Sequence, residues 1–319
     1  MIITVTLNAA IDKSLSVPSF RLGRRHRTVE RRALAGGKGV NIARMLKTLG
    51  EPVVATGFQG GPTGTQIVAQ LTEESILHDF VRIREESRTN TSVLDPTTGE
   101  QTEINEQGPS VDPDEVAQFR DKLLYLARGA AIAVFAGSLP RGIEPDFYAG
   151  LVRELRKLDV ATIVDTDGEA LRLAVRAEPD VVSPNVVEAE ELVGHEFNDD
   201  ADRVGAVREI VSLGARSAIM TVHDGCWAQM LVAGAPQAFH VTVPLVEAVA
   251  TIGSGDAFLA GYVAGRYRGL APVECLRYGV ACGAESTGRL GAGLIDAREV
   301  ERLLAEVAAS EVAMAASVP

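Results

Sequence analysis

Short hydrophobic runs alternate along the chain with longer amphipathic stretches. The runs are rich in Val, Ile and Ala, which is typical of buried strands. Those that predict strands are residues 2–7, 53–58, 131–136, 161–165, 180–183 and 218–221. The stretches with helical spacing are residues 38–49, 64–74, 112–127, 145–158, 168–176 and 201–213. Because strands alternate with helices, the pattern predicts right-handed β-α-β units and a mostly parallel sheet covered by helices on both faces.

One part of the chain departs from this alternation. Residues 88–105 predict a β-hairpin without a strong hydrophobic face, so we expect it to lie outside the main core. We expect a single domain over residues 1–319, with a small β lid built from about residues 12–34 and 88–107.

The last third of the chain closes the sheet. Residues 226–243 predict antiparallel strands at one edge, because two β-rich runs follow each other without a helix between them. Two late helices are expected at about residues 272–287 and 297–309.

Composition narrows the class of protein. The chain has 319 residues and a net charge of −12, which argues against a general nucleic-acid or anionic-membrane partner. Its three cysteines, Cys226, Cys275 and Cys282, lack the spacing of a metal site or a disulfide framework. No hydrophobic run reaches the roughly 18 residues of a membrane span. We therefore expect a cytoplasmic protein with reduced thiols.

The stretch around residues 250–261 carries the strongest chemical pattern. Gly253, Ser254 and Gly255 precede Asp256 and a small-residue helix. Glycines allow successive N–H groups to point to one side, and the helix N-terminus adds its positive dipole, so the stretch predicts an anion cradle. A carboxylate at its rim suits phosphoryl transfer, in which it accepts the proton of the attacking hydroxyl. The alternative is an ordinary turn in which Asp256 caps the helix.

A second glycine-rich turn opens the helix at residues 38–49. Gly36, Gly37 and Gly39 surround Lys38, but the spacing is not that of a Walker A loop. Such glycines allow a small polar ligand to approach the backbone, and Lys38 and Asn41 would then hydrogen-bond sugar hydroxyls or a phosphate.

Two further polar groups occur near the N-terminus. Asn8 and Asp12 follow the first strand, at the sheet end where ligands bind in open α/β sheets; otherwise Asp12 is an ordinary loop carboxylate. Residues 21–32 are strongly basic for an acidic protein. This segment is either a solvated edge strand or a site for a phosphate already on the substrate. Its arginines are Arg21, Arg24, Arg25, Arg27, Arg31 and Arg32.

These pieces, taken in order, resemble the ribokinase-like PfkB sugar kinases over nearly the whole chain. The resemblance rests on Thr6-Leu7-Asn8 with Asp12, on residues 36–44, on Ser138-Leu139-Pro140, on Asp165 with residues 168–171, on Pro184-Asn185 with Glu188, and on residues 253–256. Within the family, the chain looks most like the branch that phosphorylates ketohexose phosphates. That branch includes 1-phosphofructokinase, tagatose-6-phosphate kinase and the minor 6-phosphofructokinase.

The resemblance implies a Rossmann-like domain with a small β lid that often forms a homodimer, and it implies ATP and Mg²⁺ as cofactors. It assigns Asp256 as the catalytic base and Gly253, Ser254 and Gly255 as the anion hole. The residues that it places at the sugar phosphate are Asp12, Arg25, Arg27, Gly37, Lys38, Asn41, Arg88, Asn90 and Ser138. Those that it places at the nucleotide are Asn185, Thr221, His223, Gly225, Gly253, Gly255 and Gly283. Glu188 and Asn185 would hold Mg²⁺, largely through water.

Three positions depart from the family pattern, all in the nucleotide half. They are Ser183, where a lysine is common, His223, near which a glycine is usual, and Ala250, where many members have an aspartate.

The leading interpretation is an ATP- and Mg²⁺-dependent kinase of a phosphorylated ketohexose, with fructose 1-phosphate first and tagatose 6-phosphate or fructose 6-phosphate next. The alternatives are a kinase of an unphosphorylated sugar or nucleoside and a non-catalytic sugar-phosphate sensor.

Overall fold

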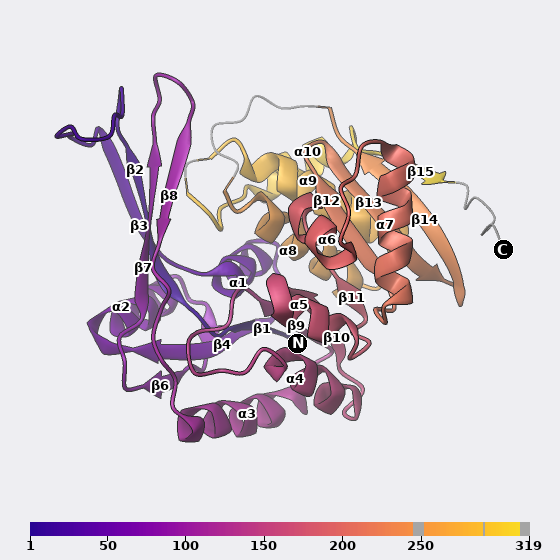
Figure 1. Cartoon of the computed structure of the whole chain (residues 1–319), viewed down its shortest axis with the longest axis horizontal. Coiled ribbons are helices and arrows are strands. Elements are labelled where there is room, and N and C mark those ends of the chain that lie inside the picture. The colour runs from indigo at the N-terminus through magenta and orange to yellow at the C-terminus, as the bar shows by residue number, and fades with distance from the viewer. Residues whose placement is uncertain (245–251, 290, 313–319) are drawn as a thin grey trace.

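A computed structural model describes residues 1–244, 252–289 and 291–312. These residues form an eleven-stranded main sheet and a separate four-stranded sheet (Figure 1). The main-sheet strands, in spatial order, are β15 (Ala308–Val312), β14 (Ala235–Thr242), β13 (Gly225–Val232), β12 (Ala218–Val222), β11 (Val181–Val182), β10 (Ala161–Asp165), β9 (Ile132–Ala136), β1 (Ile2–Thr6), β4 (Val53–Gly60) and β5 (Leu77–His78), with β6 (Val81–Ile83) beside β4.

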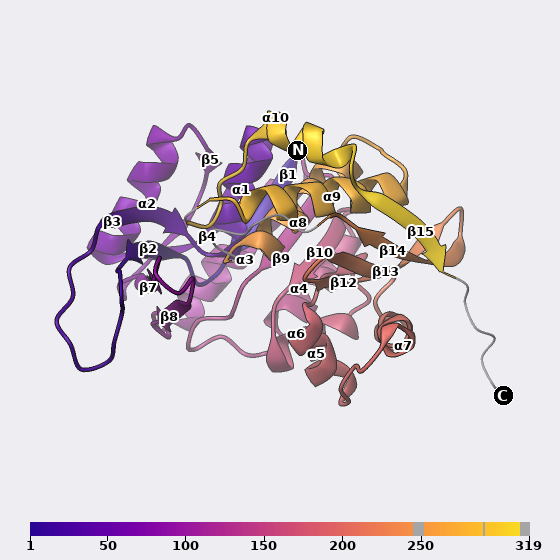
Figure 2. The same cartoon turned by 90° about the horizontal axis from the view of Figure 1, so that it is seen from above.

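Helices cover both faces of this sheet, as the alternation of strands and helices predicts (Figure 2). One face carries α1 (Lys38–Thr48), α8 (Ser254–Tyr267), α9 (Pro272–Ser286) and α10 (Ala297–Leu304). The other carries α3 (Pro113–Ala127), α4 (Phe147–Arg156), α5 (Gly168–Val175), α6 (Val186–Val193) and α7 (Asp200–Ser212). The central strands β1 and β9 are buried along their whole length because both faces are covered.

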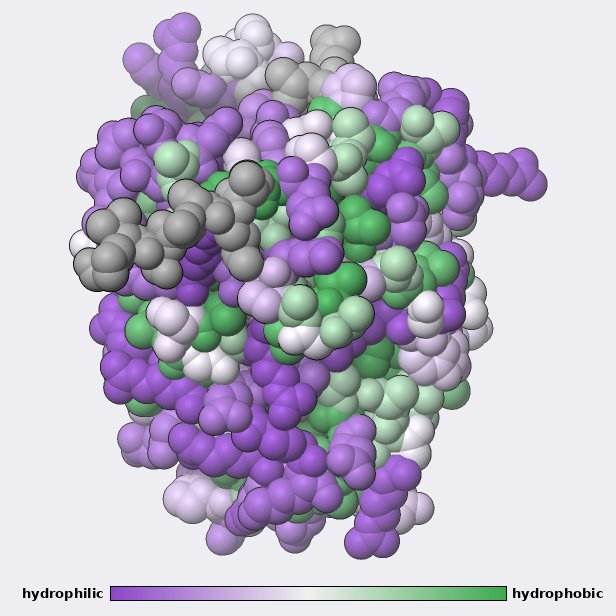
Figure 3. Space-filling view, turned by 90° about the vertical axis from the view of Figure 1, so that its right-hand side faces the viewer, coloured by the Kyte–Doolittle hydropathy of each residue, from purple (hydrophilic) through white to green (hydrophobic). Residues whose placement is uncertain are grey.

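The strands from β12 to β5 are parallel, and β13 to β15 extend the sheet antiparallel. The antiparallel pair predicted within residues 226–243 is confirmed. The late helix is shorter than predicted, because α10 ends at Leu304 and β15 then pairs with β14. The side of the molecule where α7, β14 and β15 lie shows hydrophilic side chains interspersed with hydrophobic ones, as on a solvated surface (Figure 3).

The small sheet stands at one side of the molecule (Figure 1). Its strands, in spatial order, are β3 (Glu30–Gly36), β2 (Ala10–Ser16), β7 (Arg88–Leu94) and β8 (Gln101–Asn105). The alternative that Asp12 is an ordinary loop carboxylate is wrong: β2 begins at Ala10, and Asp12 lies on it opposite Asn90 of β7. Asp12 is part of a strand because β2 pairs with β3 on one side and β7 on the other.

Some elements lie outside the sequence-based expectations. Helix α6 was not predicted, although Asn185 and Glu188 form the reciprocal cap at its start. The helix α2 spans Gly61–Glu73 and begins three residues before the predicted start, with Pro62 in its first turn. Among the described residues, no helix combines the length and hydrophobicity needed to cross a membrane.

Candidate active site

The predicted anion cradle is the first turn of α8. Gly253 precedes the helix in the left-handed region, with φ of 87°, which glycine adopts without strain. A side chain could not fit there, because a β-carbon would lie 2.7 Å from the β-carbon of Ala292. Ser254 and Gly255 therefore stand in the first turn of the helix, where backbone N–H groups have no intrahelical partner and can stabilise an anion. Ala250, one of the three departures from the family pattern in the nucleotide half, lies outside the described residues.

Asp256 lies in this turn and is buried, with 6% of its surface exposed. Nδ2 of Asn41 donates a hydrogen bond of 2.8 Å to its Oδ2. Burial raises the pKa of Asp256 to about 7, and the Lys38 ammonium opposes this rise. A carboxyl group with such a pKa can accept a proton at neutral pH and remain a stronger base than an ordinary aspartate.

Asp12 is held beside the glycine-rich turn before α1. Its Oδ2 accepts from the backbone N–H of Gly37 at 3.3 Å, and its Oδ1 accepts from Nδ2 of Asn90 at 2.9 Å. Gly37 has φ of 96°, again in the left-handed region. These contacts orient one carboxylate from β2 toward the start of α1, where it can accept hydrogen bonds from ligand hydroxyls.

Arg88, the first residue of β7, belongs to the same region of the site. Its Nε donates to the carbonyl of Asn8 at 3.1 Å and its Nη1 to the carbonyl of Glu106 at 2.9 Å. Burial lowers its pKa, but an arginine keeps its charge at neutral pH. Nearby, Nδ2 of Asn8 donates to Oγ of Ser138 at 3.2 Å, so Ser138 is linked to the site through Asn8.

Lys38, predicted to contact the sugar phosphate, lies close to Glu188, which is predicted to hold Mg²⁺. Its Nζ lies 2.9 Å from Oδ1 of Asp165 and 3.7 Å from Oε1 of Glu188. Burial acts to lower the pKa of this ammonium, but the nearby carboxylates, with Asp165 first among them, raise it overall. Burial also raises the pKa of Glu188. A phosphate that reached Lys38 would replace carboxylate partners by phosphate oxygens.

Asn185 and Glu188 form a reciprocal cap at the start of α6. The Glu188 carboxylate accepts from the N–H of Asn185 at 2.9 Å, and Oδ1 of Asn185 accepts from the N–H of Glu188 at 3.0 Å. One carboxylate and one amide form a small set of oxygen ligands. Within residues 1–244, 252–289 and 291–312, no group of three or more His, Cys, Asp or Glu side chains is arranged to hold a metal ion. The pair suits an Mg²⁺ ion that keeps its waters and binds phosphates as well.

Two cavities meet at the first turn of α8. One, of about 560 Å³, is lined by Ser254 and Gly255 and by hydrophobic side chains such as Phe258 and Val280. The other, of about 340 Å³, is lined by Gly253 and Asp256 and by polar groups of the small sheet. The anion cradle and the buried carboxyl group therefore lie where the two cavities adjoin.

The predicted residues divide between these cavities. The larger cavity is lined by Asn185, Thr221, His223, Gly225, Gly255 and Gly283 of the predicted nucleotide set. The smaller is lined by Asp12, Gly37, Lys38, Asn41, Arg88 and Asn90 of the predicted sugar set, and by Gly253. Arg25 and Arg27 differ: they are exposed in the loop between β2 and β3, at the far end of the small sheet (Figure 1), and line neither cavity.

Sequence reasoning missed several polar residues of the smaller cavity, and those of β8 stand out among them. Gln101, Glu103 and Asn105 lie on β8 and line it from the small sheet. Their spacing of two residues puts them on one face of the strand, and this alternation was the available signal. Arg88 and Asn90 in the first strand of the predicted hairpin were assigned to the sugar phosphate, but no residue of its second strand was.

Comparison with known proteins agrees with this arrangement. Residues 5–298 match the model of the pfkB family carbohydrate kinases. The chain is 30% identical to a 1-phosphofructokinase of Borreliella burgdorferi, covering 98% of this chain and 99% of that protein. It is 31% identical to a tagatose-6-phosphate kinase of Staphylococcus epidermidis, covering 98% and 100%. It resembles the crystal structure of a possible 1-phosphofructokinase of Thermotoga maritima, with a TM-score of 0.89, 25% identity and 98% and 100% coverage. The predicted ribokinase-like fold is confirmed.

Proposed function

We propose that this chain, which belongs to the pfkB family of carbohydrate kinases, transfers the γ-phosphoryl group of ATP to a hydroxyl of a phosphorylated ketohexose. Fructose 1-phosphate is the first candidate, followed by tagatose 6-phosphate and fructose 6-phosphate. The relatives named for phosphorylated ketohexoses support this substrate class.

One observation carries the proposal: the first turn of α8 separates the two cavities. Ser254 and Gly255 line the larger cavity, whereas Asp256 lines the smaller. A phosphoryl donor on one side and a hydroxyl acceptor on the other would thus meet at free N–H groups and a carboxyl group. Placing both reactants there supplies much of the catalysis through proximity and charge stabilisation.

In the proposed reaction, Asp256 accepts the proton of the sugar hydroxyl as its oxygen attacks the γ-phosphorus. The bond between that phosphorus and the bridging oxygen of ADP breaks, and the electron pair leaves with ADP. N–H groups of Ser254 and Gly255 stabilise the charge on the moving phosphoryl oxygens. Lys38 stays charged because its ammonium lies beside the carboxylates of Asp165 and Glu188, and it lines the smaller cavity, where it can stabilise that negative charge.

Mg²⁺ and the nucleotide would be bound by residues of this chain. Asn185 and Glu188 would hold a hydrated Mg²⁺ ion beside the donor phosphates, which supplies positive charge for the phosphoryl oxygens. The larger cavity offers the hydrophobic surface of Phe258 and Val280 for the nucleotide, next to the anion cradle. Ser183, which departs from the family pattern, is buried before α6 and does not line this cavity.

The existing phosphate of the sugar is assigned to Arg88, the one predicted arginine that lines the smaller cavity. Arg25 and Arg27 can contribute only if their exposed loop moves or if a second copy presents it. We propose such a homodimer through the small sheet. Among the described residues, the outer edges of β3 and β8 pair with no further strand, and the exposed side chains there include Val29 and Ile104.

The test is ADP release, coupled to an indicator reaction, with ATP and Mg²⁺. The acceptors are fructose 1-phosphate, fructose 6-phosphate, tagatose 6-phosphate, fructose and ribose, and Asp256→Asn is the control. Turnover of a sugar phosphate that Asp256→Asn lowers at least about 10²–10⁴-fold supports the proposal. Preference for fructose or ribose favours a kinase of unphosphorylated sugars. Tight sugar-phosphate binding without any turnover favours a sensor.

A further inference from the structure

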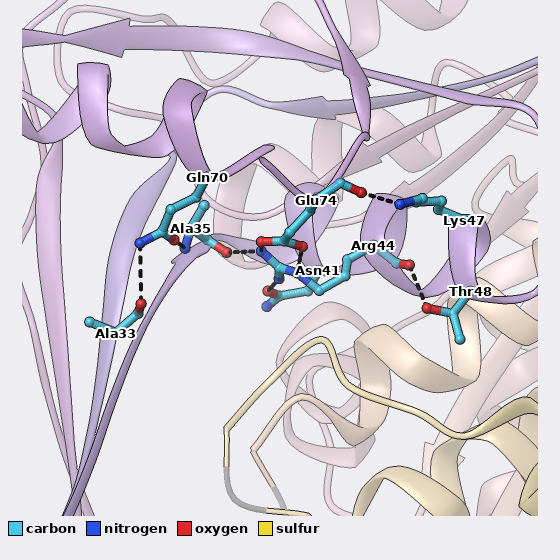
Figure 4. A network of polar contacts seen from close by, with 8 residues as sticks. All are labelled: Ala33, Ala35, Asn41, Arg44, Lys47, Thr48, Gln70 and Glu74. Atoms are coloured by element: carbon cyan, nitrogen blue, oxygen red, sulfur yellow. Dashed lines mark hydrogen bonds and ion pairs between the residues drawn. The ribbon is translucent and has the colours of Figure 1, made fainter. Parts of the chain in front are cut away.

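Arg44 is a buried arginine of α1 that joins three elements (Figure 4). Its Nη2 donates to the carbonyl of Ala35, at the end of β3, at 2.7 Å. The carboxylate of Glu74, which directly follows α2, accepts from Nε and, at 3.0 Å, from Nη2. The guanidinium thus connects the end of β3, in the small sheet, to the helices α1 and α2.

The same guanidinium reaches the proposed base through one amide. Nη1 of Arg44 lies 3.4 Å from Oδ1 of Asn41, and Nδ2 of Asn41 donates to Oδ2 of Asp256. A side-chain amide has an acceptor end and a donor end. A cation against the oxygen leaves the donor end facing the carboxylate. The reversed amide would place its oxygen against Asp256 and its NH₂ group against Arg44, and both contacts would be repulsive.

The surroundings leave this pair little freedom. A β-carbon on Gly293 would lie 2.8 Å from Nη1 of Arg44 and 2.9 Å from Oδ1 of Asn41, so the loop backbone covers them directly. On the other side, Gln70 of α2 accepts from the N–H of Ala35 and donates to the carbonyl of Ala33 at 3.3 Å. The end of β3 is thus fixed from α1 and α2 together (Figure 4).

We propose that Arg44 is a positioning residue for phosphoryl transfer, which holds the donor end of the Asn41 amide toward Asp256 and ties the small sheet to the helix that carries Asn41. The inference rests on the proposed function, because it takes Asp256 as the base. Arg44 itself does not line either cavity.

A pH profile separates this role from a merely structural one. The other groups that act on Asp256 are Lys38 of α1, Asp165 of β10 and Asp12 of β2. The bond from Asn41 lowers the pKa of Asp256, because it favours the charged form. Loss of that bond should move the acid limb of kcat/KM upward by about one pH unit, the size expected for one hydrogen bond.

The experiment uses Arg44→Met and, at the partly exposed outer end of the network, Glu74→Gln. Lys47→Met is the matched control, since Lys47 also lies on α1 and donates to the carbonyl of Glu74 but does not contact Asn41. We expect Arg44→Met to lower kcat roughly 10- to 100-fold, as small misplacements of reacting groups do, and to shift the acid limb. Glu74→Gln should lower kcat and shift the acid limb in the same direction as Arg44→Met, but by smaller amounts. Lys47→Met should leave both unchanged.

Coupling to Asn41 gives the second readout. If Arg44 acts through Asn41, the double variant Arg44→Met/Asn41→Ala should lose no more kcat than Asn41→Ala alone. Additive losses, or an unmoved acid limb in folded Arg44→Met and Glu74→Gln, overturn the inference. If Arg44→Met does not fold, the test of the inference rests on Glu74→Gln and on the double-mutant cycle of Glu74→Gln with Asn41→Ala.

Wild type and Asp256→Asn are measured in the same series. A wild type that phosphorylates no sugar phosphate, or an Asp256→Asn variant that keeps its activity, refutes the proposed function, and the inference falls with it. An Asp256-dependent kinase whose Arg44 variants behave like Lys47→Met refutes the inference alone.

Discussion

A β-carbon on Gly36 would lie 2.0 Å from Oδ2 of Asp12 and 2.4 Å from its Cγ. The carboxylate that faces the smaller cavity therefore occupies the space that any other residue at position 36 would need. The absence of a side chain at Gly36 is a condition for the orientation of Asp12.

Replacing this glycine should impair sugar binding. We expect Gly36→Ala to push the Asp12 side chain away from Gly37 and Asn90 and to raise the KM for the sugar phosphate about 10-fold or more, the cost of one or two hydrogen bonds to a charged group. The KM for ATP should hardly change. Gly150→Ala in α4 is the control, because a β-carbon there meets no atom within 4 Å. Equal changes in both KM values would contradict the role of Asp12.

The rate should fall in acid because of Asp256. The pKa of this group is raised to about 7, mainly by burial, so the carboxyl becomes protonated as the pH falls through that value. A protonated carboxyl cannot accept the hydroxyl proton, and kcat/KM should fall about tenfold per pH unit below about pH 7. Lys38→Met should move this limb upward, because the ammonium opposes the rise in pKa. A flat profile from pH 5.5 to 8 would exclude Asp256 as the base.

The same burial should cost stability. Because the folded-state pKa is above the unfolded value of 3.8, the folded chain binds the proton more tightly, and stability is lost as the pH rises from about 4 to 7. At pH 8, Asp256→Asn should therefore raise Tm by a few degrees, while at pH 4.5 the difference should shrink. The measurement is a thermal melt of the ligand-free proteins at both pH values. A variant that is less stable at pH 8 would show that the ionised group contributes more through Asn41 than burial costs.

Arg88 should distinguish phosphorylated from free sugars. We expect Arg88→Met to raise the KM for fructose 1-phosphate about 10- to 100-fold, since hydrogen bonds to charged groups contribute about 1.5–3 kcal/mol. The KM for fructose should change little. Arg141→Met is the control, because Arg141 also donates to a backbone carbonyl of this region, that of Gly108, and does not line the smaller cavity. Parallel losses with both sugars would assign Arg88 a structural role only.

Much of the fold follows from local pattern. The hydrophobic runs at β1, β9 and β10 are strands because both faces of a parallel sheet are buried, which makes such runs continuous. The short strands β5 and β6 and the edge strand β15 were not predicted. They contain only a few residues, or exposed ones, and are defined by pairing with a neighbour.

The site was predicted from glycines and charged residues whose order matches a family pattern. Their division between two cavities depends on contacts across the chain, such as Asn41 with Asp256, 215 positions apart, and could not be read from spacing. The role of Arg44 is of the same kind: in the sequence it is one polar position of an amphipathic helix. The family resemblance placed Arg25 and Arg27 with Arg88 at the sugar phosphate, but in this chain they lie in an exposed loop between β2 and β3.

The residues that line the smaller cavity from β8 belong to an edge strand, whereas the anion cradle and Asp256 belong to one turn of a buried helix. We therefore expect that Gln101, Glu103 and Asn105 can be exchanged without moving the anion cradle or Asp256. Such a chain is suited to acquiring new sugar preferences in evolution, and a library confined to these three positions is a practical way to retarget it.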